Sequence, residues 1–113
     1  MNVTEPTDSA ELAERLAALA HPARLDILRH LAGAEGCCCC KDVVGRLELA
    51  QSTVSQHLKV LVAAGLLRME ADRQRSLYSV DRGALAALAA RLDGLLQDCC
   101  AGMPCSGSQQ RQE

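Results

Sequence analysis

The chain has 113 residues, seven cysteines, one tyrosine, no phenylalanine or tryptophan, and a formal net charge of −2 at pH 7. This length predicts one domain whose modest core is built from leucine, alanine and valine, so burial against a second copy is expected. No apolar run approaches the roughly 20 residues that cross a bilayer. We therefore expect no membrane association, no secretory signal, and a cytoplasmic protein with reduced thiols.

The N-terminal third of the chain predicts two helices. Asp8 is a capping residue for the first helix, and Glu11 follows it at the capping-box spacing. His21 and Pro22 interrupt the pattern, and Pro22 suits the first position of a second helix that ends at Gly33. We expect His21 to cap a helix or to pack between helices. The apolar face of the first helix consists of Leu12, Leu16 and Leu19.

A short helix at about 41–47 and a longer one at about 51–64 follow in the sequence. The three residues 48–50 between them suffice only for a turn, so this segment predicts a helix-turn-helix. Gly65 marks the end of the longer helix, because glycine adopts a positive φ without steric cost.

The last third predicts a β-hairpin and a closing helix. Strands at 66–69 and 77–80 flank a charged tip at 70–75. Asp81 then caps a helix at about 82–97. This order of elements predicts a mainly α winged helix-turn-helix fold with a small β-hairpin. The closing helix carries a leucine repeat suited to a partner helix, formed by Leu85, Leu88, Leu92 and Leu95.

The charge is distributed unevenly along the chain. Between Lys41 and Arg82 there are seven basic and five acidic residues, whereas the remainder has five basic and nine acidic residues. The predicted second helix of the helix-turn-helix carries short, amide or basic side chains and no acids, as expected for a helix that reads the major groove. Arg73 and Arg75 suit the flanking DNA backbone or the minor groove. The alternative is the solvent face of an ordinary amphipathic helix. The predicted helical DNA contacts are Gln51, Ser52, Thr53, Ser55, Gln56, His57 and Lys59.

Three segments together resemble the ArsR/SmtB family of metalloregulatory repressors. They read ALAHPARLDIL at 18–28, QSTVSQHLKVL at 51–61 and AGLL at 64–67. The resemblance implies a homodimer formed through the first and last helices, which binds double-stranded operator DNA and releases it when an inducer binds. Two departures are Ala50, where the family often has a capping serine, and Arg73, where the wing tip often has glycine.

Three cysteines near the C-terminus are the predicted sensor. Cys99, Cys100 and Cys105 supply sulfur ligands without histidine or carboxylate partners. Such a set suits a lone-pair ion, As(III) or Sb(III), because zinc and cadmium prefer a fourth ligand. The spacing also resembles the C-terminal triads of arsenite-responsive repressors of this family. We divide the chain into a DNA-binding and dimerisation domain at 1–98 and a flexible, cysteine-bearing tail at 99–113.

A second group of thiols, Cys37, Cys38, Cys39 and Cys40, leaves alternatives open. It lies one residue out of register with a Cys-x-Cys-Asp-Leu sequence that several family members carry there. The run is either buried packing, since free cysteine packs well, or a second thiolate site. It can also combine with the tail across the dimer.

Other functions are also compatible with parts of this sequence. The same fold could sense cadmium, lead, or redox or persulfide state through its thiols. A thiol oxidoreductase formally fits the spacing of Cys37 and Cys40, but the βαβ context of such enzymes is missing. The sequence offers no catalytic cofactor site and no nucleophile–base pair, so we do not expect an enzyme.

Overall fold

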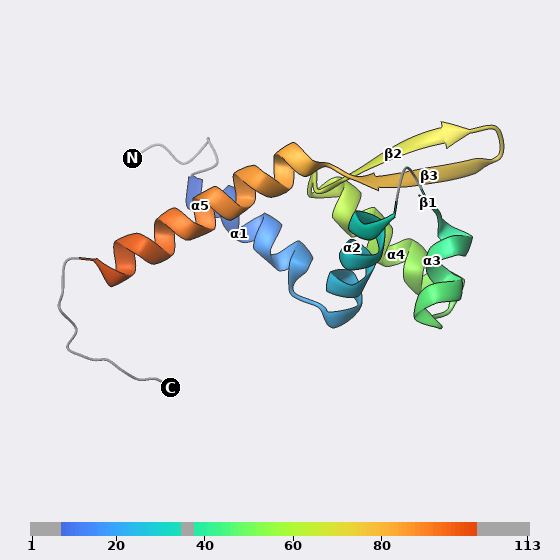
Figure 1. Ribbon diagram of the computed structural model, residues 1–113, viewed down its shortest axis with the longest axis horizontal. Helices are drawn as coiled ribbons and strands as arrows, with labels where there is room; N and C mark the ends of the chain where they lie inside the picture. Colours follow the sequence, from blue (N-terminus) through green and yellow to red (C-terminus); the bar gives the residue numbers. More distant parts are fainter. Residues whose placement is uncertain (1–7, 35–37, 102–113) are drawn as a thin grey trace.

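The computed structural model describes residues 8–34 and 38–101 of the chain. These residues form a mainly helical unit with one small sheet, in the order predicted for a winged helix-turn-helix (Figure 1). The elements are α1 (Asp8–Leu19), α2 (Pro22–Gly33), β1 (Cys38–Cys39), α3 (Cys40–Leu47), α4 (Gln51–Ala63), β2 (Leu67–Asp72), β3 (Arg75–Val80) and α5 (Arg82–Cys100).

The boundary between α1 and α2 follows the local signals in the sequence. His21 is the N-cap of α2, and its Nδ1 accepts a hydrogen bond of 3.1 Å from the backbone N–H of Ala23. Pro22 occupies the first helical position, where a backbone N–H would have no helical acceptor. The helix ends at Gly33. The predicted capping role of His21 and both ends of α2 are confirmed.

The helix-turn-helix is formed by α3 and α4. Glu48 ends α3 in the left-handed region, with φ of 57°, and its N–H donates to the carbonyl oxygen of Val44 at 2.9 Å. Ala50 is the N-cap of α4 and supplies no side-chain hydrogen bond, which agrees with the weak cap predicted there. Gly65 has φ of 81°, so the predicted glycine turn after α4 is confirmed.

The wing differs from its prediction in length and in strand number. Pairing between β2 and β3 runs from Leu67–Val80 to Asp72–Arg75, so the strands extend almost to the tip and leave Arg73 and Gln74 in the turn. The strand β1 was not predicted; it pairs antiparallel with the other edge of β3 and places Cys39 opposite Leu77. The cysteine run therefore enters the sheet.

The described core is aliphatic, as the composition predicts. Its buried side chains come mainly from α2, the helix-turn-helix and the start of the wing, and α5 adds Leu88. No described helix is long and apolar enough to cross a membrane. The fully buried large side chains are Ile27, Leu31, Val43, Val54, Leu58, Leu61 and Leu66.

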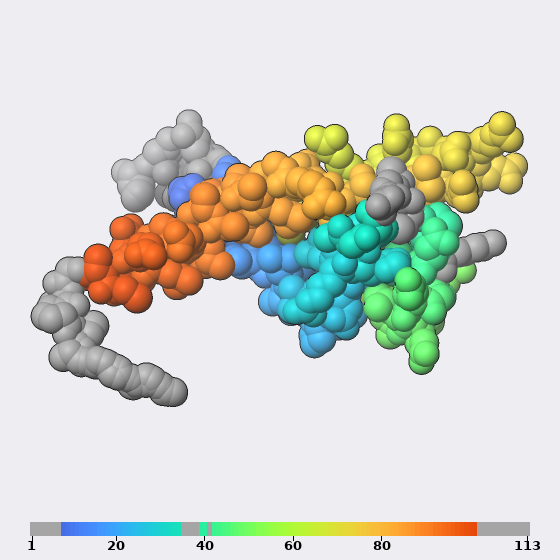
Figure 2. All heavy atoms as spheres, in the orientation of Figure 1, coloured from blue at the N-terminus to red at the C-terminus, as the bar shows by residue number. Residues whose placement is uncertain are grey.

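The closing helix α5 runs past the rest of the described chain. Figure 2 shows its C-terminal half projecting beyond the body formed by the other helices. Along its leucine repeat, Leu88 is buried, whereas Leu95 is 46 % exposed. The neighbouring Leu96 is 52 % exposed. The outer half of the leucine seam is therefore uncovered in the single chain.

Candidate nucleic-acid interface and thiol sites

The exposed face of α4 carries most of the polar residues predicted to contact DNA. Val54, Leu58 and Leu61 are buried and fix this helix on the core. The opposite face has no acidic side chain, so nothing on the helix itself repels a phosphate backbone. Ser55 is half-buried, and the exposed members of the predicted set are Gln51, Ser52, Thr53, Gln56 and Lys59.

His57 does not lie on this exposed face, so the expectation that it belongs to the DNA-reading surface is wrong. Its side chain is buried, and its Nδ1 accepts a hydrogen bond of 3.1 Å from Nε of Arg24. Its ring centroid lies 4.4 Å from that of His21. Burial lowers the pKa of His57, and the nearby charges of His21 and Arg24 lower it further. His57 lies three positions after Val54 and four positions before Leu61, on the same face of the helix as these two buried residues. This spacing is the signal that could have placed His57 inward.

Arg24 fixes the position of the recognition helix from outside the helix-turn-helix. Besides His57, it donates to the carbonyl oxygens of Ala17 at 3.4 Å and Ala18 at 3.2 Å, near the end of α1. One guanidinium thus connects the end of α1, α2 and α4. This role of Arg24 was not predicted, because the contact joins residues 33 positions apart in the sequence.

The tip of the wing presents two exposed arginines. Arg73 lies in the turn with φ of 62°, a left-handed conformation that favours glycine. Arg75 forms an exposed ion pair of 3.5 Å with Asp72 across the hairpin. Their guanidinium groups are free to turn toward a phosphate, because exposed ion pairs are weak.

An open concavity of about 1090 Å³ joins the wing, the start of α4 and the start of α3. Gln51 and Ser55 line it from α4, and Arg73 and Arg75 line it from the wing. The predicted DNA contacts of two separate elements therefore share one surface. The third wall was not predicted as part of it and consists of Cys39 and Cys40.

Asp42 organises the start of α3 around these thiols. Its Oδ2 accepts hydrogen bonds from the backbone N–H of Cys39 at 3.1 Å and from the Cys39 thiol at 3.4 Å. The bonds from Cys39 hold the pKa of the Asp42 carboxyl below its usual range, with smaller contributions from the charges of Arg75 and His30. Burial raises the pKa of the Cys40 thiol, and the neighbouring Cys39 raises it further. Cys40 is therefore a neutral thiol at neutral pH.

The predicted sensor thiols lie at the other end of the described chain. Cys99 and Cys100 are exposed, free cysteines in the last turn of α5, which continues three residues beyond its predicted end at 97. Cys105 lies outside the described residues, as does Cys37. Within 8–34 and 38–101, no group of three or more histidine, cysteine or acidic side chains could hold a metal ion.

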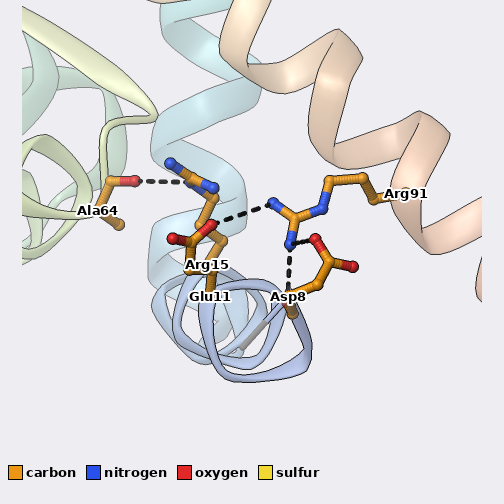
Figure 3. A network of polar contacts seen from close by, with 5 residues as sticks. All are labelled: Asp8, Glu11, Arg15, Ala64 and Arg91. Carbon is orange, nitrogen blue, oxygen red and sulfur yellow. Dashed lines mark hydrogen bonds and ion pairs between the residues drawn. The ribbon is translucent and has the colours of Figure 1, made fainter. Parts of the chain in front are cut away.

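A polar network connects α5 with α4 through α1 (Figure 3). Arg91 of α5 donates to the carbonyl oxygen of Asp8 at 2.7 Å and pairs with the carboxylates of Asp8 and Glu11. One turn along α1, Nε of Arg15 donates at 3.2 Å to the carbonyl oxygen of Ala64 at the end of α4. A single face of α1 therefore contacts both the closing helix and the C-terminal end of the recognition helix.

Comparison with known proteins agrees with this architecture. A family model described as a helix-turn-helix domain matches residues 19–70. The HTH-type transcriptional regulator YbzH of Bacillus subtilis, described as uncharacterized, is 34 % identical over 92 residues, which cover 70 % of this chain and 92 % of that protein. The arsenical resistance operon repressor of Staphylococcus xylosus is 31 % identical over 83 residues, covering 74 % of this chain and 78 % of that protein.

A solved structure gives the same result for the fold. It is the homodimeric winged helix-turn-helix domain Mb0332 of Mycobacterium bovis, described as a possible ArsR-family regulator. It superposes with a TM-score of 0.64 at 25 % identity and covers 90 % of this chain and 94 % of that one. The motifs, the fold and these relatives lead to one assignment: the chain belongs to the ArsR/SmtB family of helix-turn-helix transcriptional regulators.

Proposed function

We propose that this protein is a repressor that binds operator DNA as a dimer and releases it when As(III) or Sb(III) binds the thiolates of Cys99, Cys100 and Cys105. The observation that carries the proposal is the pair of exposed, free cysteines in the last turn of α5. Soft, accessible thiolates select thiophilic ions over harder metals. The similarity to the arsenical resistance repressor of Staphylococcus xylosus supports the same inducer class.

Operator binding is supported by the shared surface of α4 and the wing. The acid-free face of α4 suits base edges in the major groove, and Arg73 and Arg75 suit the adjacent phosphates. Two such helices must lie about 34 Å apart to enter successive major grooves of one duplex. A dimer is therefore the unit that reads a palindromic site.

Dimerisation is supported by the uncovered part of α5. Leu95 and Leu96 are about half exposed in the single chain, and the homodimeric Mycobacterium bovis domain has the same fold. A seam of leucines at heptad-like spacing buries well against a second helix. Inducer binding at the end of α5 would then act on the helix that sets the distance between the two recognition helices.

The switch is tested by measuring DNA release as arsenite is added. A duplex selected for tight binding by the wild-type protein is followed by fluorescence anisotropy. The Cys99→Ser and Cys105→Ser variants should bind this duplex normally but need at least about tenfold more arsenite for release, within the 5–150-fold range typical of allosteric coupling. Gln97→Ser, which alters the same helix end without removing a thiol, is the control: it weakens the last turn of α5 and should not raise the arsenite concentration needed for release. If either cysteine variant releases the duplex at the same arsenite concentration as the wild-type protein, the tail triad is excluded as the sensor.

A second candidate keeps the fold and changes the signal to cadmium, lead, or redox or persulfide state. The observation in its favour is the other pair of free thiols, Cys39 and Cys40, on the surface shared by α4 and the wing. Release of DNA by an oxidant without any metal would favour a redox sensor. Cadmium bound by four sulfurs, seen as thiolate-to-metal absorption, would favour a metal sensor.

A further inference from the structure

The third wall of the concavity has no role in the proposed switch. Cys39 and Cys40 face the same open space as Gln51, Ser55 and the wing arginines. Among the residues that line this space, Arg73 and Arg75 are basic and Asp72, which is paired with Arg75, is acidic. The exposed carboxylate of Asp42 lies against Cys39 at the edge of the same wall. The wing arginines are therefore the groups that would attract an anionic partner into this space, where it would also meet the two thiols.

The chemistry of the two thiols is compatible with such a partner. The Cys39 thiol donates a hydrogen bond of 3.4 Å to the Asp42 carboxylate, and the Cys40 thiol is neutral at neutral pH. Neither group then adds a negative charge to the wall of the concavity. The backbone of Cys39 is fixed as well, by its pairing with β3 and by its N–H bond to Asp42. The thiol wall is thus held at a constant position relative to the wing.

We propose that Cys39 and Cys40 are part of the DNA-contact surface, where the backbone of a duplex covers them when α4 and the wing engage. The inference rests on the DNA binding proposed above, and its partner is the phosphate backbone of double-stranded DNA. A group added to the Cys39 sulfur occupies the space of that backbone. DNA binding and modification of Cys39 therefore exclude each other, independently of the thiols at the end of α5.

The first test measures how fast each cysteine of the full chain is alkylated by iodoacetamide, with and without DNA. In this reaction the thiolate sulfur displaces iodide from the methylene carbon, and the thiol proton passes to the buffer. The probe is a mixed-sequence duplex of 30 base pairs at about 50 mM salt, where backbone contacts are strong. Tandem mass spectrometry assigns the adducts to single cysteines.

Saturating DNA should slow alkylation of Cys39 at least about tenfold and leave Cys99 and Cys100 unchanged. These two exposed cysteines at the far end of α5 are the control within the same molecule. Equal rates at Cys39 with and without bound duplex would overturn the inference, while the anisotropy signal still reports DNA binding. If the anisotropy shows no binding of any duplex, the proposed function itself fails.

The second test reverses the order of the two events. Protein alkylated while DNA covers it carries adducts on Cys99 and Cys100, and after removal of the DNA it should bind fresh duplex like untreated protein. Protein alkylated without DNA should bind at least about tenfold more weakly, with an unchanged circular dichroism spectrum and melting temperature. Undiminished affinity of protein shown to carry the adduct on Cys39 would contradict the inference.

Discussion

His57 and Arg24 show how a polar residue can hold the recognition helix without facing DNA. The Nδ1 atom of His57 accepts a hydrogen bond from Nε–H of Arg24, so Nδ1 must carry no proton and the imidazole must be neutral for this contact to exist. A proton on Nδ1 would place two donors against each other inside the core. The pKa of His57 is accordingly lowered, chiefly by burial.

Stability should depend on pH through this histidine. Because the pKa of His57 is lower in the folded than in the unfolded chain, the unfolded chain binds more protons below about pH 6.5. The free energy of unfolding should therefore be constant above that pH and decrease as the pH falls below it. Urea unfolding at a series of pH values measures this dependence. His57→Gln, which keeps an acceptor for Arg24, should weaken it, and an unchanged pH profile in this variant would assign the dependence to other groups.

At Arg73, backbone strain lowers the stability of the fold, whereas the positive charge favours DNA binding. Its φ of 62° costs a non-glycine residue about 1 kcal/mol. Arg73→Gly should raise the free energy of unfolding by about that amount, and it should weaken DNA binding because a phosphate contact is lost. The slope of log affinity against log salt should decrease by about one unit. Gln74→Gly, at the adjacent turn position without positive φ, should give no gain in stability. An unchanged salt slope for Arg73→Gly would mean that Arg73 does not contact phosphate.

At the scale of elements, arginine side chains hold the recognition helix at two places, its middle and its C-terminal end. Its N-terminus lacks a side-chain cap, its middle is fixed by Arg24, and its C-terminal carbonyl at Ala64 accepts from Arg15 of α1. A cation near the C-terminal end of a helix also compensates the helix dipole. The weakest attachment is therefore the end that enters the concavity.

Capping this end should stabilise the protein. Ala50→Ser would supply an oxygen to accept from the free N–H groups of the first turn of α4, which should raise the free energy of unfolding by about 1 kcal/mol. Thermal or urea unfolding measures the gain. The same change at Ala89, an exposed interior position of α5, should be neutral or slightly destabilising, because serine is a poorer helix former than alanine. An equal effect at both positions would argue against capping as the cause.

Elements with local signals were predictable from the sequence, and contacts between distant residues were not. Pro22 and Gly65 depend only on backbone geometry, and Asp81 caps α5 by accepting from the N–H of Ala84 at 3.0 Å. Residues of this kind made most helix boundaries predictable to within a few residues. The strand β1 escaped prediction because it is defined by pairing with β3, about 40 residues away. His57 was misplaced for a similar reason, since its polarity suggested exposure while its partner lay in another helix.

At the scale of the whole molecule, α5 is both the uncovered apolar surface and the carrier of the predicted sensor. Arg91 ties its middle to α1, while Leu95 and Leu96 lie beyond that tie. A second copy that covers these leucines would anchor the projecting half of the helix. Inducer chemistry at Cys99 and Cys100 would then take place directly beside the subunit interface.

A charge on this projecting half should prevent self-association. Leu95→Glu should shift the protein from dimer to monomer in sedimentation experiments and weaken its binding to a palindromic duplex, because a buried carboxylate in a leucine seam is costly. Met69→Glu changes an equally exposed apolar residue on β2 and should leave the dimer intact. A dimer that persists in Leu95→Glu would place the subunit interface elsewhere.

The helical state of Cys99 and Cys100 has a consequence for the dose at which the proposed switch responds. Neighbouring side chains leave an α-helix about 100° apart, so one ion can join both sulfurs only after the last turn opens. The ion must supply the free energy that this local unwinding costs. Residues that strengthen the final turn of α5 would raise the inducer concentration at half-response, and residues that weaken it would make the sensor more sensitive. The helix propensity of a few residues at 96–101 would thus tune the sensitivity of a transcriptional response without changing any ligand.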